Sequence, residues 1–125
     1  VELVFKAIEE SKGGETYISK IPSFKIGDLA QAMSFNSLGK EADIQDIGIR
    51  EGEKLHEVMV TKDDSRMTYE YDKHYIVYPD YNWKNELDIL AGGKLVEDGF
   101  EYNSGTNTQW LNVEELREAL QDMNK

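Results

Sequence analysis

The sequence predicts an α/β fold in which helices pack against short strands and a β-hairpin. Apolar residues recur at helical spacing in several stretches, which include residues 1–8, 27–35 and 113–123. Between Met67 and Tyr78, tyrosines instead alternate with polar residues, which is typical of strands. There are no internal repeats and no low-complexity segments. We therefore expect a single domain over residues 1–125.

The first part of the chain predicts a helix, a strand and a second helix. The first helix carries apolar residues at helical spacing and ends at Gly13-Gly14; these residues are Val1, Val4, Phe5 and Ile8. A strand from Thr16 to Lys20 follows and is closed by Pro22. The second helix covers Gly27 to Phe35, with Asp28 in its first turn, where negative charge is favourable. Its predicted buried face consists of Leu29, Ala32 and Met33.

The middle of the chain predicts a polar turn, a strand and a third helix. Residues 34–40 are polar and are expected to end the second helix. A strand over Ile44–Ile49 then leads to Arg50, and Gly52 permits a tight turn. From Glu53 the pattern favours a helix whose core face consists of Leu55, Val58 and Met59.

The second half predicts a β-hairpin, an irregular stretch and a final helix. The hairpin runs from Met67 to Tyr78 and turns near Asp72-Lys73. Residues 80–100 are acidic, and we expect a variable loop or an insertion there. Asn112 caps the final helix, and Glu115 completes a capping box. Its predicted inner face consists of Val113, Leu116, Leu120 and Met123.

Composition excludes several classes of function. A net charge of −11 and a pI near 4.6 disfavour nucleic-acid binding, which needs a basic face, and docking on an anionic membrane. No apolar run reaches the roughly 18 residues of a spanning helix, and the first ten residues do not resemble a signal peptide. The absence of cysteine excludes disulfides and thiolate metal sites and fits a cytoplasmic protein.

No protein metal site is expected either. His56-Glu57 resembles the start of a zinc-protease His-Glu-x-x-His motif, but Val60 stands where the second histidine belongs. The sequence has only one other histidine, His74.

The turn around Arg50 is the strongest candidate for a ligand site. A guanidinium beside the free N–H groups of a helix start would favour an anion, and Glu53 would accept hydrogen bonds from sugar hydroxyls. An Arg-x-Gly-Glu turn therefore suggests a site for a nucleotide diphosphate sugar. The alternative is a surface arginine paired with a nearby carboxylate.

Three stretches in the same order resemble the bacterial inverting UDP-N-acetylglucosamine 4,6-dehydratases. They are residues 14–24 (GETYISKIPSF), 48–59 (GIREGEKLHEVM) and 102–111 (YNSGTNTQWL). The resemblance extends from Val1 to about Leu120. These enzymes serve flagellin and surface-glycan biosynthesis and belong to the extended short-chain dehydrogenase/reductases. The resemblance implies the C-terminal, substrate-binding portion of such an enzyme, without its Rossmann half.

The resemblance also implies roles for particular residues. Arg50 would hold the diphosphate of UDP-N-acetylglucosamine, and Glu53 would bind the ribose hydroxyls. Tyr102 and Asn103 would lie near the sugar or the nucleotide, and Lys20 is a second possible phosphate contact. For Lys20 the alternative is a solvated lysine, and for the loop from Tyr102 it is a loop anchored by Trp110 and Leu111. Many relatives have Arg-Pro-Gly-Glu at this turn, whereas this chain has Glu51 in place of the proline.

For the whole enzyme the resemblance implies a lyase that uses NADP and is a homo-oligomer in the cytoplasm. NADP oxidises C4 transiently, water is lost across C5–C6, and the hydride returns at C6. This chain has no glycine-rich dinucleotide turn. Tyr69 and Lys73 match the spacing of the family's Tyr-x-x-x-Lys pair, but they lie in a predicted strand and far from the family's position. No catalytic residue therefore maps onto this chain, which we expect to be inactive alone and to leave NADP to another part of the protein.

Two functions from different classes remain open. The first is the UDP-sugar-binding part of a dehydratase. The second is a freestanding non-catalytic module that binds nucleotide sugars or other proteins. Oligomerisation through an exposed apolar face would favour the first, and a soluble monomer would favour the second.

Overall fold

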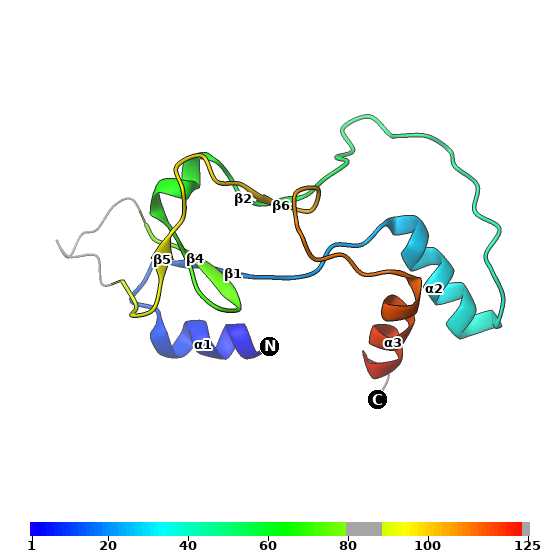
Figure 1. Cartoon of the computed structure of the whole chain (residues 1–125), viewed down its shortest axis with the longest axis horizontal. Coiled ribbons are helices and arrows are strands. Elements are labelled where there is room, and N and C mark those ends of the chain that lie inside the picture. Colours follow the sequence, from blue (N-terminus) through cyan, green and yellow to red (C-terminus); the bar gives the residue numbers. More distant parts are fainter. Residues whose placement is uncertain (80–88, 124–125) are drawn as a thin grey trace. The chain divides into compact units, whose positions relative to one another are not determined.

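The computed structural model describes residues 1–79 and 89–123. Its elements are α1 (Glu2–Glu10), β1 (Thr16–Ser19), α2 (Ile26–Leu38), β2 (Val58–Val60), the 3₁₀ helix η1 (Asp63–Met67), β3 (Thr68–Glu70), β4 (His74–Val77), β5 (Lys94–Leu95), β6 (Tyr102–Asn103) and α3 (Val113–Met123) (Figure 1). Their contacts divide the chain into two compact units. The sheet unit comprises Val1–Ile21 and Val58–Asn103, and the helical unit comprises Pro22–Glu57 and Ser104–Lys125.

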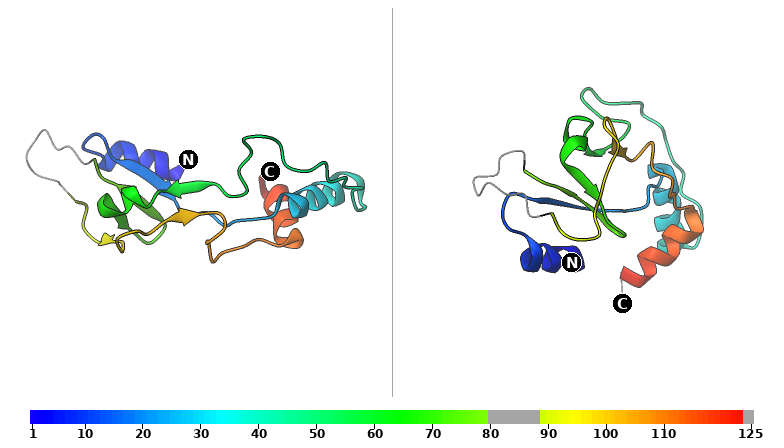
Figure 2. Two further views of the ribbon diagram at one scale, coloured as in Figure 1. Left: turned by 90° about the horizontal axis from the view of Figure 1, so that it is seen from above. Right: turned by 60° about the vertical axis from the view of Figure 1, so that its left-hand side comes forward.

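The sheet unit contains a four-stranded antiparallel sheet and a smaller pair of strands. The strand order of the larger sheet is β1-β4-β3-β5, and β2 pairs antiparallel with β6. The helix α1 lies alongside β1 (Figure 2). The buried core of this unit consists of Ile18, Val60, Tyr75 and Tyr102.

The predicted β-hairpin is confirmed. Strands β3 and β4 pair antiparallel, with Tyr69 opposite Ile76, and the chain reverses between them over residues 71–73. Tyr75 and Ile76 are both buried although they are neighbours in the strand, so both faces of β4 are covered. Of the predicted loop at 80–100, residues 80–88 lie outside the described residues, and β5 falls in the remainder.

The first helix and strand are also confirmed, with one qualification about exposure. The helix ends at Ser11, which is extended, just before the two glycines. The apolar residues that predicted the helix are exposed: Val1, Val4, Phe5 and Ile8. The half-buried residues of α1 are instead Leu3, Ala7 and Glu10.

The helical unit is built on α2 packed against α3 (Figure 2). Across this contact, the side-chain amide of Asn36 donates to Arg117 O at 3.0 Å, and the Arg117 guanidinium lies 5.1 Å from the Phe35 ring centre. Ala32 and Leu116 are buried. These contacts join residues far apart in the sequence.

Predictions for the ends of α2 and α3 need correction. The polar turn expected from residue 34 is wrong, because α2 continues to Leu38 and ends at Gly39 in the left-handed conformation, φ 67°. Ser34 is buried, and its hydroxyl donates to Lys40 O at 2.7 Å, which satisfies a polar side chain inside the helix. Met33 and Met123 are exposed rather than buried, so the buried faces are narrower than predicted.

The capping box at the start of α3 is confirmed in both directions. Asn112 Oδ1 accepts a hydrogen bond from Glu115 N at 3.0 Å, and Glu115 Oε2 accepts one from Asn112 N at 2.8 Å. Two N–H groups that the helix itself leaves unpaired are therefore satisfied.

The strand predicted over Ile44–Ile49 is wrong. Residues 41–50 contain no helix or strand, and residues 43–59 are exposed throughout. The isoleucines that suggested a strand have no partner strand to pair with among the described residues. A strand needs such a partner because an isolated one leaves its backbone groups unpaired.

Candidate functional site

The Arg50 turn is a β-turn closed by two hydrogen bonds. Glu53 N donates to Arg50 O at 3.1 Å, and Arg50 N donates to Glu53 Oε2 at 2.9 Å. Glu51 and Gly52 are the central residues, and Gly52 has φ 80°, a conformation that glycine adopts without strain. The turn therefore needs both the glycine and the glutamate that the motif contains.

The helix predicted from Glu53 is wrong, and with it the helix N-terminus that was expected to attract an anion. Residues 53–57 form no helix, Leu55 is 78% exposed, and Val58 begins β2 instead. The apolar spacing of residues 55, 58 and 59 fits a helix, but β-branched valines at 58 and 60 also suit a strand. Pairing with β6 decides for the strand.

What remains for an anion is the guanidinium of Arg50. The side chain is exposed, so a ligand can reach it from the solvent. Guanidinium binds phosphate through parallel charge-assisted hydrogen bonds. Two carboxylates, Glu51 and Glu53, lie within the same turn and reduce its positive potential. The geometry supports one cationic contact beside an acceptor, which is a weaker anion site than the one predicted.

Lys20 has a partner in the sheet unit. Its ammonium lies 2.7 Å from Glu70 Oε1 and 5.1 Å from the centre of the Tyr75 ring. A phosphate at Lys20 would compete with a carboxylate already in contact. The role of Lys20 as a phosphate contact stays a prediction.

Tyr102 and Asn103 are both buried in β6, and each uses its polar atoms within the fold. The Tyr102 hydroxyl bonds to both backbone groups of Ile21, and the side-chain amide of Asn103 donates to Glu101 Oε1. The Tyr102 ring packs 5.2 Å from that of Tyr75. Tyr75, which sequence analysis did not single out, thus contacts both Lys20 and Tyr102. Burial raises the pKa of its hydroxyl.

Within the helical unit, the structure brings together the second and third family-like stretches. Glu57 N donates to Ser104 Oγ at 3.0 Å, and Ser104 N donates to Glu57 O at 2.9 Å. The imidazole of His56 lies directly against Gly105. The sequence analysis considered His56 only as a metal ligand, and the residue pattern around Gly105 indicates a turn and not this contact.

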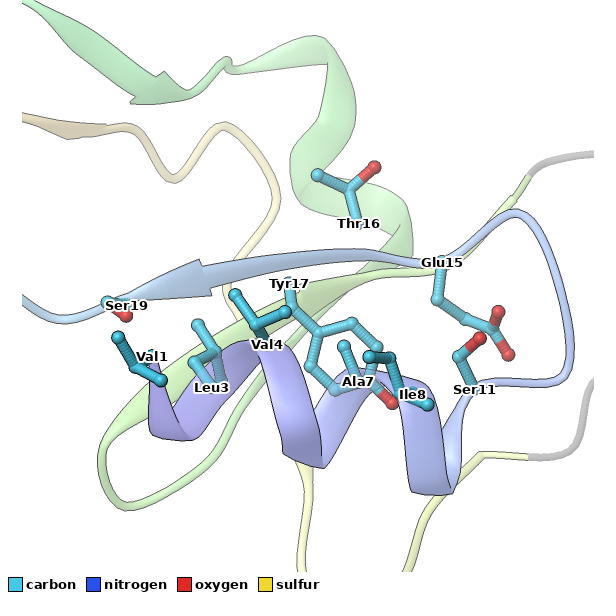
Figure 3. A pocket seen from close by; sticks show the side chains of 10 residues that line it. All are labelled: Val1, Leu3, Val4, Ala7, Ile8, Ser11, Glu15, Thr16, Tyr17 and Ser19. Carbon is cyan, nitrogen blue, oxygen red and sulfur yellow. The ribbon is translucent and has the colours of Figure 1, made fainter.

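A separate groove lies between α1 and β1 (Figure 3). It has a volume of about 610 Å³, and its mainly apolar lining includes Val1, Val4, Ile8 and Tyr17. None of the predicted substrate-binding residues lines it. Its chemistry does not suit a charged nucleotide sugar.

The described part of the chain holds no metal-binding cluster and no membrane-spanning helix. Residues 1–79 and 89–123 hold no group of three or more His, Asp or Glu side chains placed to bind a metal ion. Within the same ranges no helix has the length and apolar character needed to cross a bilayer.

Comparison with known proteins agrees with the sequence analysis. Residues 1–79 match the family described as polysaccharide biosynthesis protein. The chain is 42% identical over 126 aligned positions to a UDP-N-acetylglucosamine 4,6-dehydratase (inverting) from Campylobacter jejuni, covering 96% of this chain and 36% of that protein. The predicted resemblance to the inverting dehydratases is confirmed.

Two further matches broaden the picture. A UDP-glucose 4-epimerase from Rickettsia felis is 32% identical, over 96% of this chain and 35% of that protein. The X-ray structure of Pen from Bacillus thuringiensis superimposes with a TM-score of 0.80 at 28% identity, covering 98% of this chain and 36% of that one. The chain therefore spans about a third of the length of each of these three proteins.

Proposed function

Starting from the fact that this chain belongs to the polysaccharide biosynthesis protein family, we propose that it is the UDP-sugar-binding part of a UDP-N-acetylglucosamine 4,6-dehydratase. One observation carries the proposal. The dehydratase and epimerase relatives have names that differ in the reaction but share a UDP-sugar, and this chain covers about a third of each. A portion common to proteins with different reactions is suited to binding what their substrates share.

In this proposal Arg50 binds the diphosphate and Glu53 binds ribose hydroxyls. Each charge-assisted hydrogen bond to phosphate contributes about 1.5–3 kcal/mol. The β-turn supports these roles because Glu53 Oε2 is held at Arg50 N, which keeps the carboxylate close to the guanidinium-bearing residue. The carboxylates of Glu51 and Glu53 oppose binding of phosphate, so we expect modest affinity for UDP alone.

Tyr102, Asn103 and Lys20 are weaker candidates in the same proposal. Each would have to exchange an existing partner for the ligand: Ile21, Glu101 and Glu70 respectively. Glu53 also has a partner, Arg50 N, but that hydrogen bond uses only one carboxylate oxygen, and both Arg50 and Glu53 are exposed. We therefore base the test on the Arg50 turn.

NADP belongs to the proposed full-length enzyme, but the described residues of this chain do not fit it. Dinucleotide binding needs a strand, a glycine-rich turn and a helix that follow one another. Here the paired glycines at 13 and 14 follow a helix and precede a strand. We assign the cofactor, the C5-inverting chemistry, homo-oligomer formation and a cytoplasmic location to the whole protein, and expect this chain alone to be inactive.

The alternative, a freestanding non-catalytic module, predicts a soluble monomer, and if the module binds only nucleotide sugars its apolar surface should be covered. Instead, Val4, Phe5 and Ile8 of α1 are 60%, 61% and 72% exposed. This exposure disfavours a module that binds only nucleotide sugars, and it fits a part that packs against other protein. Light scattering across a concentration series tests it: association supports the proposal, and a strict monomer supports the module.

The direct test is a titration of the chain with UDP, followed by amide NMR. We expect shifts in residues 50–55 and 104–107, and their loss in Arg50→Ala. Lys54→Ala is the matched control, because it removes an exposed cation from the same segment without touching the turn. Unchanged binding in Arg50→Ala would overturn the assignment of the diphosphate to this residue. Absence of shifts at millimolar UDP, both here and in a full-length family member, would overturn the proposed function.

A further inference from the structure

His56 lies so close to Gly105 that a Cβ atom at position 105 would require the imidazole to shift. A Cβ atom placed on Gly105 would lie 2.8 Å from His56 Nδ1 and 2.9 Å from both Cδ2 and Cε1. Nearly equal distances to ring atoms on opposite sides place this position over the face of the imidazole. The ring therefore packs flat against the Gly105 backbone, and a side chain at position 105 would require the exposed imidazole to shift.

The neighbouring residues reinforce this contact. Glu57 and Ser104 exchange two hydrogen bonds, of 3.0 Å and 2.9 Å, immediately beside it. Residues 56–57 and 104–105 thus form a short two-sided junction inside the helical unit. We call this junction the His56 anchor.

The His56 anchor is one of two points that hold the exposed segment carrying the Arg50 turn. At the other end, the side-chain amide of Gln31 bonds to both backbone groups of Ala42, at 2.9 Å and 3.3 Å. Residues 43–55 between these points are all exposed and contain no helix or strand. Loops of this length without regular structure are uncommon in compact domains and are often functional. The anchor follows the turn within a few residues, whereas Ala42 is farther away.

We propose that His56 is a positioning residue for the nucleotide-binding turn. Its ring, held on Gly105, fixes the end of the turn and limits the conformations that Arg50 and Glu53 sample before a ligand arrives. Such preorganisation improves affinity by reducing the ordering cost of binding. The inference rests on the proposed function, since it concerns how this chain holds the diphosphate of a UDP-sugar.

The substitution Gly105→Ala isolates the contact. Gly105 does not have a positive φ, so alanine is not strained there. The atoms that must move belong to an exposed side chain, and the fold should remain intact. We expect UDP binding to weaken about three- to tenfold, a typical cost of losing such preorganisation, and amide exchange at Arg50 and Glu53 to accelerate even without UDP.

Companion variants separate this role from a merely structural one. His56→Ala should weaken binding as Gly105→Ala does, and the double variant should be no weaker than His56→Ala, because both changes remove one contact. His56→Phe retains a flat ring and should bind UDP within about twofold of the wild type, as expected if packing rather than charge carries the effect.

The outcomes distinguish failure of the inference from failure of the proposed function. If Arg50→Ala abolishes UDP binding while Gly105→Ala and His56→Ala leave both binding and amide exchange unchanged, the inference is overturned and the proposed function stands. If the wild type and a full-length family member show no binding of UDP, both are overturned. Additive losses in the double variant would also contradict a shared contact.

Discussion

The hydroxyl of Tyr102 joins both backbone groups of Ile21, accepting a hydrogen bond from Ile21 N at 2.9 Å and donating one to Ile21 O at 3.0 Å. The phenol ring is buried, 8% exposed, and packs on Tyr75. A residue that resemblance places near the ligand thus closes the chain onto itself within the sheet unit. Substitution of Tyr102 should therefore affect the stability of the fold more directly than the affinity for a ligand.

We predict that Tyr102→Phe lowers the free energy of unfolding by about 1–2 kcal/mol, since two hydrogen bonds are lost. Urea denaturation measures the change. Tyr17→Phe is the control, because it removes a hydroxyl and keeps the ring that stacks on His74. A loss of UDP affinity in Tyr102→Phe with no loss of stability would instead assign its hydroxyl to the ligand.

Gly93 should not tolerate alanine. A Cβ at this position would lie 2.5 Å from Tyr71 Cζ and Oη. The Tyr71 hydroxyl is fixed by Leu90 O at 2.9 Å and by the Tyr78 hydroxyl at 2.9 Å, so the ring cannot move cheaply. We expect a loss of about 1–3 kcal/mol from this overpacking, measured as a lower urea midpoint.

The matched control for Gly93 is Gly27→Ala. Gly27 lies in α2, and nothing is within 4 Å of the position its Cβ would take. We expect stabilisation of up to about 0.5–1 kcal/mol, because alanine loses less backbone freedom than glycine in a helix. Equal effects of the two substitutions would contradict the packing argument.

Asn112→Ala should weaken α3. It removes the side-chain acceptor for Glu115 N, and loss of such a cap costs about 1 kcal/mol. Thermal unfolding followed by circular dichroism detects the change. Glu118→Ala, an exposed substitution on the same helix, should have little effect. If both variants melt alike, the capping box contributes nothing measurable.

His74 should make stability fall at mildly acidic pH. Its ring stacks between Tyr71 and Tyr17 at 5.0 Å and 5.9 Å, and among the described residues its buried Nε2 has no hydrogen-bond partner. Burial lowers the pKa of His74, and of the charged residues nearby Lys6 and Lys20 lower it further while Glu10 raises it.

The direction of this pH dependence follows from comparing His74 in the unfolded and the folded chain. In the unfolded chain this histidine has a pKa of about 6.5, so it binds a proton more readily than it does in the folded chain. The stability associated with neutral His74 is therefore full above that value and is lost as pH falls toward the lower folded-state pKa. His74→Phe retains the stack and should flatten this decline in urea midpoints, whereas His56→Phe should keep it. The same decline in both variants would place its origin elsewhere.

Local chemistry made some features predictable before any tertiary structure was known. The capping box at the start of α3 is closed by contacts within a few residues, and the hairpin needs only two adjacent strands. The Arg50 turn was predictable as a turn for the same reason, since Gly52 and Glu53 close it locally.

Other features depend on partners distant in sequence, and the residue pattern there was ambiguous or misleading. The spacing of Leu55, Val58 and Met59 fits a helix, but pairing with Tyr102–Asn103 makes the latter part a strand. The isoleucines before Arg50 alternate as in a strand and stay irregular without one to pair with. Because residues 53–57 form no helix, the helix N-terminus that was expected to bind an anion together with Arg50 does not form.

The sequence by itself determined the family, the capping box of α3, the turns at Gly52 and near Asp72, and the candidates Arg50 and Glu53, because these depend on residue identity and local geometry. Only the tertiary structure decided that Tyr102 binds Ile21, that Lys20 pairs with Glu70, and that His56 packs on Gly105. Each of these contacts joins segments whose approach depends on how the whole unit packs. Periodicity along the chain carries no information about such an approach, since it records which face is apolar and not what that face meets.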